Sequence, residues 1–248
     1  MKLKKEYYIF IYIKIHNIMD QSYYCFSAFV RQVYNLYMSN PSDKSSLVSK
    51  HLNKILLSYL EELKINKTQL KKFKTKLDKV SKKLLKMNQR MKKELIQELP
   101  HLKHRITDLN SAVMGVANDN DSDIDITIAV NNSNEQKKVG KVLKSLGYEL
   151  THIYNENKPA RMKWHTFHKY IDNIEIEVKV RSIRIVKRVL ISHKNIKNNL
   201  TPSQKLKVSF IKSILSHGDK RTYKTFKYIL YGAMFEGHKH TVIFRHSN

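Results

Sequence analysis

Residues 111–130 read SAVMGVANDNDSDIDITIAV, and this stretch decides the fold of the region around it. Its apolar start, Ala112 to Met114, predicts a short strand, and Gly115 with the Asn and Asp residues that follow predicts a turn. Polar and apolar residues then alternate from Asp123 to Ile128. A period of two is typical of a strand with one buried face. The stretch therefore predicts a strand, a turn and a second strand.

The second of these strands carries two carboxylates on one face. Asp123 and Asp125 are two residues apart, so their side chains point the same way and lie about 6 to 7 Å apart along the strand. Two such groups repel each other unless a cation lies between them, and carboxylate oxygens are the hard ligands that Mg²⁺ prefers. The pair predicts a divalent-cation site, although a charged pair on the exposed face of an edge strand has the same pattern.

A second acidic strand is predicted from Ile174 to Val180, where Glu175, Glu177 and Lys179 share a face. If it lies beside the first acidic strand, three carboxylates converge. Three carboxylates are what a two-cation phosphoryl-transfer site needs, with one cation activating the attacking oxygen and the other holding the triphosphate.

A hairpin is predicted immediately before this second acidic strand. Residues 164–170 predict its first strand, and Ile171-Asp172-Asn173 predicts its turn. The two histidines of the first strand, His165 and His168, show no metal-ligand spacing with other ligands. We interpret them as exposed side chains or as side chains that fill the hairpin.

The glycine turn, the Ser122-Asp123-Ile124-Asp125 segment and the later acidic strand resemble the nucleotidyltransferases of the DNA polymerase β superfamily, over residues 109–181. The resemblance implies that Asp123 and Asp125 are catalytic metal ligands and that Glu177 is the third acid, with Glu175 as second choice. Glu177 is preferred because residues 177–181, EVKVR, also resemble the glutamate strand of the alarmone synthetases in the same superfamily.

The same resemblance implies a nucleotide site at Gly115, Val116 and Ser122. Arg161 and Lys179 are candidates to neutralise the triphosphate, with simple exposure to solvent as the alternative for each. The family usually has Ser or Gly after the glycine, and this chain has Val116, so a hydroxyl that would hold the triphosphate is missing. The loop from the glycine to the first Asp is also several residues shorter than in the family. Backbone N–H groups of the turn remain as an alternative cradle for a phosphate.

Two other acidic motifs, the EF-hand loop and the Asp-x-Asp of glycosyltransferases, have residues in common with this stretch. An EF-hand is excluded, because Ile124 stands at loop position 6 where Gly is required and Val130 stands at position 12 where Glu is required. A sugar-nucleotide glycosyltransferase also uses Asp-x-Asp with a divalent cation. It would need a Gly-rich nucleotide-binding region upstream, where this chain has a Lys-rich helix instead.

The composition of the chain is strongly basic. Its 248 residues include 47 Lys and Arg against 21 Asp and Glu, for a formal net charge of +26. Such an excess favours a polyanionic partner, with RNA or DNA first and an anionic membrane surface second. An AT-rich genome, which encodes many Lys, Asn and Ile residues, is the alternative explanation. The single cysteine, Cys25, allows no internal disulfide, which favours a reducing, cytoplasmic location.

Helical patterns surround the acidic strands, and the fold class predicted is α+β. We expect an uncertain extension at residues 1–45, a Lys-rich helical arm at 46–105, a nucleotidyltransferase core with a small mixed sheet at 106–182, and a helical C-terminal region at 183–248. The apolar run near the N-terminus is far shorter than the roughly 20 residues of a membrane span, so no membrane partner is expected. Met19 and Met38 are alternative start sites.

The sequence leads to one functional hypothesis and two alternatives. The hypothesis is transfer of a nucleotide from an NTP to an acceptor hydroxyl, at an RNA end, with Mg²⁺ or Mn²⁺ held by Asp123, Asp125 and Glu177. The first alternative is a nucleic-acid-binding protein on a transferase fold that has lost its activity. The second keeps the chemistry but transfers the nucleotide to a protein or a small molecule. The nucleotide, the acceptor and the oligomeric state are left open.

Overall fold

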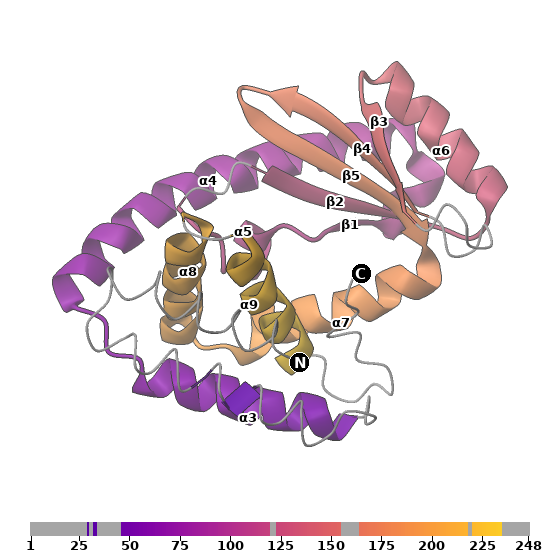
Figure 1. Ribbon diagram of the computed structural model, residues 1–248. Helices are drawn as coiled ribbons and strands as arrows, with labels where there is room; N and C mark the ends of the chain where they lie inside the picture. Colours follow the sequence, from indigo (N-terminus) through magenta and orange to yellow (C-terminus); the bar gives the residue numbers. More distant parts are fainter. Residues whose placement is uncertain are drawn as a thin grey trace. The chain divides into compact units, whose positions relative to one another are not determined.

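The computed structural model describes residues 46–119, 123–154, 164–217 and 220–234, together with residues 29, 32 and 33. The chain forms two compact units. One comprises residues 1–75 and 195–248, and the other comprises residues 76–194. Two long helices, α4 (Lys67–Glu98) and α7 (Ile183–Asn199), each run from one unit into the other (Figure 1). Among the described helices, none combines the length and apolar composition that a membrane crossing requires.

The first unit is helical. Apolar residues of α3 (Ser46–Glu62) recur every three or four positions, and this stripe packs against α8 (Pro202–Ser216) and α9 (Lys220–Ala233). Polar side chains fix the helix ends: Asn53 Nδ2 donates to the Ala233 carbonyl at 3.1 Å, and Asn195 Nδ2 donates to the Met234 carbonyl at 2.8 Å. At the start of α8, Thr201 and Gln204 form a reciprocal capping box on either side of Pro202.

The second unit contains a five-stranded sheet in the order β1-β2-β5-β4-β3. Its strands are β1 (Ile106–Asp108), β2 (Asp123–Val130), β3 (Glu149–Tyr154), β4 (Trp164–Ile171) and β5 (Ile174–Ser182). β2 and β5 run parallel, and the other three neighbouring pairs are antiparallel. The predicted fold class, α+β with a small mixed sheet between N-terminal and C-terminal helices, is confirmed.

One face of this sheet is apolar and covered by helix. The side chains of β2 and β5 on this face are fully buried, and they are Ile124, Ile126, Ile128, Ile174, Ile176, Val178 and Val180. Helix α6 (Ser133–Ser145) lies against the face, because a Cβ added at Gly140 would be only 3.2 Å from Phe167 Cζ. Gln136 of α6 also donates to the Val180 carbonyl at 3.3 Å. The opposite face of β2 and β5 carries their polar residues.

The hairpin between β4 and β5 turns at Asp172 and Asn173, as predicted, whereas Ile171 of the predicted turn belongs to β4. Asp172 and Asn173 have φ angles of 51° and 61°, in the left-handed region that Asp and Asn tolerate best among residues other than Gly. Two consecutive positive φ angles are the signature of a type I′ turn, whose twist matches that of the flanking strands. The turn fixes the register in which β4 carries His168 opposite Glu177.

The segment before Gly115 differs from the prediction. Ala112 to Met114 do not form a strand; they belong to the one-turn helix α5 (Ser111–Met114). Asn110 caps its start by accepting a hydrogen bond from the Ala112 N–H at 2.6 Å, and Gly115 ends it with a φ of 76°. Three apolar residues are too short a run to establish a period, so the capping residues on either side determine the local structure.

Candidate active site

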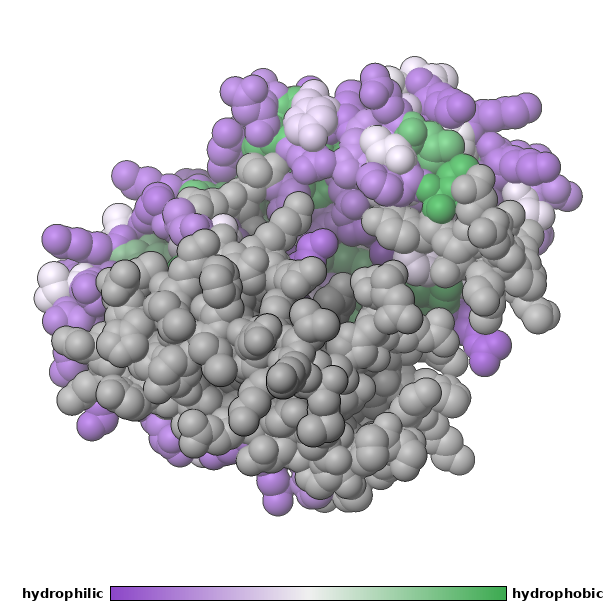
Figure 2. Space-filling view, viewed as in Figure 1, coloured by the Kyte–Doolittle hydropathy of each residue, from purple (hydrophilic) through white to green (hydrophobic). Residues whose placement is uncertain are grey.

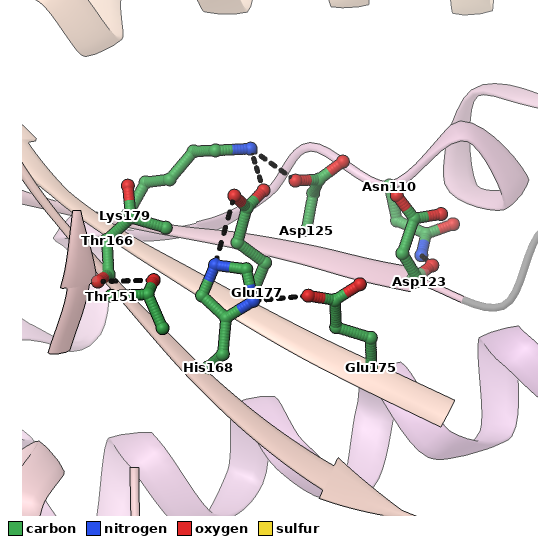
Figure 3. Close-up of polar contacts among 9 residues, drawn as sticks. All are labelled: Asn110, Asp123, Asp125, Thr151, Thr166, His168, Glu175, Glu177 and Lys179. Carbon is green, nitrogen blue, oxygen red and sulfur yellow. Dashed lines mark hydrogen bonds and ion pairs between the residues drawn. The ribbon is translucent and has the colours of Figure 1, made fainter. Parts of the chain in front are cut away.

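The two acidic strands are neighbours, as the convergence of three carboxylates requires. β2 and β5 pair in parallel with Asp123 opposite Glu175 and Asp125 opposite Glu177. Because residues two apart on a strand point to the same side, all four carboxylates lie on the polar face of the sheet. Figure 3 shows these side chains on adjacent strands, on one side of the sheet.

A lysine joins two of these acids. Lys179 Nζ donates to Asp125 Oδ1 at 2.5 Å and also contacts Glu177 Oε2 (Figure 3). The three side chains are mostly buried, with 20%, 23% and 19% of their surfaces exposed for Lys179, Asp125 and Glu177. Asp125 and Glu177 therefore already share one cationic group, which is the arrangement expected where two carboxylates are brought together away from water.

The electrostatics of the cluster shift two pKa values. The pKa of Glu177 is raised from an ordinary 4.5 to about 7, first by burial and then by the nearby Asp125, while Lys179 opposes the change. Burial lowers the pKa of Lys179, but Asp125 and Glu177 raise it by more, so its pKa lies above the ordinary value. Lys179 therefore stays positively charged at neutral pH, whereas Glu177 titrates near neutrality.

His168 is a member of the site that the sequence interpretation missed. Its Nδ1 contacts Glu175 Oε1, and its Nε2 lies 3.5 Å from Glu177 Oε1. Our interpretation of His168 as an exposed side chain is wrong, since only 18% of its side chain is exposed, and the alternative that it fills the hairpin agrees with its position between two carboxylates. Its position opposite Glu177 in the predicted hairpin could have indicated this, because cross-strand pairs on one face of a sheet are in contact.

Asp123 lies at the start of β2, next to Asn110. The Asn110 side chain donates to the backbone carbonyl of Asp123 at 3.2 Å, which ties the end of this strand to the cap of α5 (Figure 3). Within the described ranges, no three His, Cys, Asp or Glu side chains converge closely enough to form a metal site. Asp123 thus lies on the same face of β2 as Asp125, two residues earlier and opposite Glu175.

The residues predicted to hold a nucleotide have different environments. The N–H groups of Gly115 and Val116 donate to the carbonyls of Ala112 and Ser111, at 3.1 and 2.9 Å, so both are used to end helix α5. The Val116 side chain is buried. Ser122 and Arg161 lie outside the described residues. Of the predicted nucleotide ligands in the described part, Lys179 is the one that lies among the acids.

Two buried hydroxyl groups flank Lys179 on the neighbouring strands. Thr127 of β2 and Thr166 of β4 are both opposite Lys179 in register, and both are fully buried. Within the described part of the chain, neither Oγ1 atom has a hydrogen-bond partner. Buried polar atoms are normally satisfied by protein groups or ordered water, so these two hydroxyls beside Lys179 are exceptions.

The donor set is compatible with a divalent cation. Carboxylate oxygens are the preferred ligands of Mg²⁺, and Asp125 and Glu177 converge on a single positive charge, the Lys179 ammonium. A cation held by these two side chains would take the place of that ammonium. Lys179 has a flexible four-carbon stem and can move its charge away from the acids.

Comparison with solved structures gives a distant structural likeness. No family model matches the chain, and no curated protein matches it. Among solved structures, the chain is similar to the Cid1 poly(U) polymerase in its crystal structure with Mg and 3′-dATP bound, with a TM-score of 0.31 and 15% sequence identity. The similarity covers 60% of this chain and 41% of that chain, so this protein spans well under half of its structural neighbour.

Proposed function

We propose that this protein transfers a nucleotide from an NTP to an acceptor hydroxyl at an RNA end, with residues 106–182 as the catalytic core. One observation carries the proposal: Asp125 and Glu177 face each other in register on adjacent parallel strands, with Asp123 two residues earlier on the same face. In the reaction, the acceptor oxygen forms a bond with the α-phosphorus of the NTP, and the bond to pyrophosphate breaks.

Asp123, Asp125 and Glu177 are the residues that would hold Mg²⁺ or Mn²⁺. When bound, such a cation stabilises negative charge on the triphosphate and lowers the pKa of the attacking hydroxyl. The remaining chemistry belongs to the chain itself. Glu177, with its pKa raised to about 7, is suited to accept the proton of the acceptor hydroxyl.

Lys179 is proposed to bind the triphosphate of the NTP. Its ammonium pairs with Asp125 and Glu177 and remains charged at neutral pH. A phosphate oxygen would replace these carboxylates as its partner when the acids hold a cation. Thr127 and Thr166, whose buried hydroxyls flank it, would supply further hydrogen bonds there. Ser122, Arg161 and the turn at Gly115 and Val116 complete the proposed nucleotide site.

A second candidate function is nucleic-acid binding on a transferase fold that has lost its activity. It is favoured by the position after Gly115, where Val116 is buried and offers no hydroxyl, and by the two N–H groups that are already bonded to α5. The ion pairs of Lys179 also leave the acids neutralised without a metal. This candidate predicts salt-dependent RNA binding without Mg²⁺-dependent turnover.

Incubation of the purified protein with Mg²⁺, each labelled NTP in turn and a short RNA, followed by a denaturing gel, tests the proposal. The control is the Asp123→Ala/Asp125→Ala variant. Extension of the RNA by the wild type alone supports the transferase and identifies its nucleotide. Tight RNA binding without extension favours the second candidate. If a labelled product forms and added competitor RNA does not change its amount, a protein or small-molecule acceptor is favoured.

A further inference from the structure

Helix α4 carries a stripe of exposed cations away from its buried side. The buried residues of the helix in the second unit are Leu77, Leu84, Met87, Asn88, Met91 and Leu95. The stripe residues follow one another every three or four positions and are all exposed, and they are Lys79, Lys83, Lys86, Arg90 and Lys93. At 1.5 Å per residue, the stripe extends for about 21 Å, with a cation about every 5 Å.

The cations of α4 differ in what they contact. Lys76 and Lys92, on the flanks of the helix, pair with Asp119 and Asp108, each at 2.8 Å. In contrast, no described carboxylate lies within ion-pair distance of any stripe residue. Like charges at this spacing destabilise a helix, so the fold does not benefit from the stripe. A polyanion bound from outside would neutralise it.

The stripe ends at a cleft. The cleft has a volume of about 530 Å³ and is lined by Arg90, Lys93, Glu94 and Gln97 of α4 and by Lys169 and Ile171 of β4. Lys169 and Ile171 belong to the face of β4 opposite to His168, so the cleft does not share a sheet face with the acids. A cleft of this size accommodates a small molecule or a single unpaired nucleotide.

The side chains around the cleft are held in place. Lys169 Nζ donates to the Leu146 carbonyl at 2.7 Å, lies 3.7 Å from Glu94 Oε1 and is 5.2 Å from the centre of the Tyr148 ring. The Tyr148 hydroxyl is buried and has no hydrogen-bond partner among the described residues. Arg90 and Lys93 provide cations that no described carboxylate pairs with, while the Gln97 amide and Ile171 provide contacts suited to a base.

We propose that the stripe and the cleft bind the phosphodiester backbone of single-stranded RNA, with one nucleotide in the cleft. The inference rests on the proposed function, because the bound strand is the acceptor RNA; the nucleotide in the cleft is not its reacting end, since the cleft and the acids lie on opposite faces of the sheet. An anionic membrane surface fits less well, since a membrane-binding helix needs apolar residues beside its cations and those of α4 are buried. Hydrophilic side chains line the upper left edge of Figure 2, where Figure 1 places α4.

The test compares two variants that each lose four positive charges. The stripe variant is Lys83→Gln/Lys86→Gln/Arg90→Gln/Lys93→Gln. The control is Lys137→Gln/Lys138→Gln/Lys141→Gln/Lys144→Gln, whose lysines are exposed on α6 of the same unit. Binding of the full-length proteins to a fluorescent single-stranded RNA is measured by anisotropy across a salt series, with EDTA and without NTP. Circular dichroism verifies that both variants are folded.

We expect the stripe variant to bind RNA at least about tenfold more weakly than the control, with a salt slope lower by about 3, since each lost phosphate contact of a single strand contributes about 0.7. The proposal would be overturned if both variants lost the same amount of RNA affinity. It would also be overturned if duplex RNA competed as well as single-stranded RNA, or if the wild type bound anionic vesicles more tightly than single-stranded RNA. The two proposals fail separately. RNA binding that depends on the stripe, without any Mg²⁺-dependent extension, would support the RNA site and contradict the transferase.

Discussion

Lys179 Nζ lies 2.5 Å from Asp125 Oδ1, so a lysine occupies the position between the two central acids of the candidate active site. The same ammonium contacts Glu177 on the strand of Lys179 itself. This geometry means that the acid pair is stable in the absence of a metal. It also means that a divalent cation and this ammonium compete for the same oxygens, a competition that can be measured without any assay of catalysis.

Replacement of Lys179 by Met should destabilise the protein and increase its response to Mg²⁺. Without the ammonium, Asp125 and Glu177 repel each other, and the free energy of unfolding should fall by about 1 to 3 kcal/mol in EDTA. A cation that binds only the folded state adds about 2.7 kcal/mol at 100 times its dissociation constant, so Mg²⁺ should raise the Tm of Lys179→Met more than that of the wild type. Differential scanning calorimetry measures both effects.

The matched control for this prediction is Lys141→Met, which removes an exposed lysine of α6. Its Tm should stay close to the wild-type value, and its response to Mg²⁺ should be unchanged. A Lys179→Met protein that Mg²⁺ does not stabilise more than the wild type would show that Asp125 and Glu177 do not hold a divalent cation.

Stability should decrease as the pH rises through the titration of Glu177. Its pKa is raised to about 7 from 4.5, first by burial and then by Asp125, so the folded state binds the proton more tightly than the unfolded state between these values. The contribution of Glu177 is therefore complete below about pH 4.5 and is lost as the pH rises to about 7. Allowing for partial exposure, we expect a loss of about 1 to 2 kcal/mol over this window.

Urea unfolding across this pH range, in EDTA, measures the loss for the wild type, for Glu177→Gln and for the control Glu149→Gln. Glu149 is an exposed residue at the start of β3. The pH dependence should be flatter in Glu177→Gln and unchanged in Glu149→Gln. A pH dependence that is the same in Glu177→Gln as in the wild type would contradict the raised pKa.

Asp125→Asn should abolish nucleotide transfer while leaving the protein folded. The change keeps the size of the side chain and removes the charge that Lys179 and a metal would both need, so a loss of at least about a hundredfold in kcat is expected. Asp172→Asn is the control, since Asp172 lies in the β4–β5 turn with a φ of 51° that Asn also adopts. Gel-based extension assays and thermal unfolding provide the two measurements, and an active Asp125→Asn protein would remove the transferase proposal.

The sequence predicted those parts of the site that depend on local pattern. The alternation in β2 and β5 placed Asp125 and Glu177 on polar faces, and Asp172 with Asn173 predicted the turn of the hairpin. These features depend on residues within one strand or one turn. The helix start at Thr201 was predictable for the same reason, because the capping box lies within four residues.

The remaining features depend on residues that are distant in the sequence. Asp125 and Glu177 are brought into register by pairing between strands that are not consecutive in the chain, and no local pattern encodes that pairing. The pairing of His168 with Glu175 and Glu177 follows from the same sheet. The α5 segment was wrongly predicted, since Asn110 and Gly115 determine a single helical turn that three apolar residues do not reveal.

His168→Gln should lower the rate of nucleotide transfer without abolishing it. His168 contacts Glu175 and lies 3.5 Å from Glu177, so we expect it to position Glu177 without touching the substrate. Loss of a group that orients a metal ligand typically costs between 10-fold and 100-fold in activity or metal affinity, roughly the range expected here. His165→Gln is the matched control, because His165 lies on the same strand but on the face of Phe167. A positioning role predicts that His168→Gln also weakens the stabilisation by Mg²⁺ in a thermal unfolding assay, whereas His165→Gln does not; equal behaviour of the two variants in both assays would rule that role out.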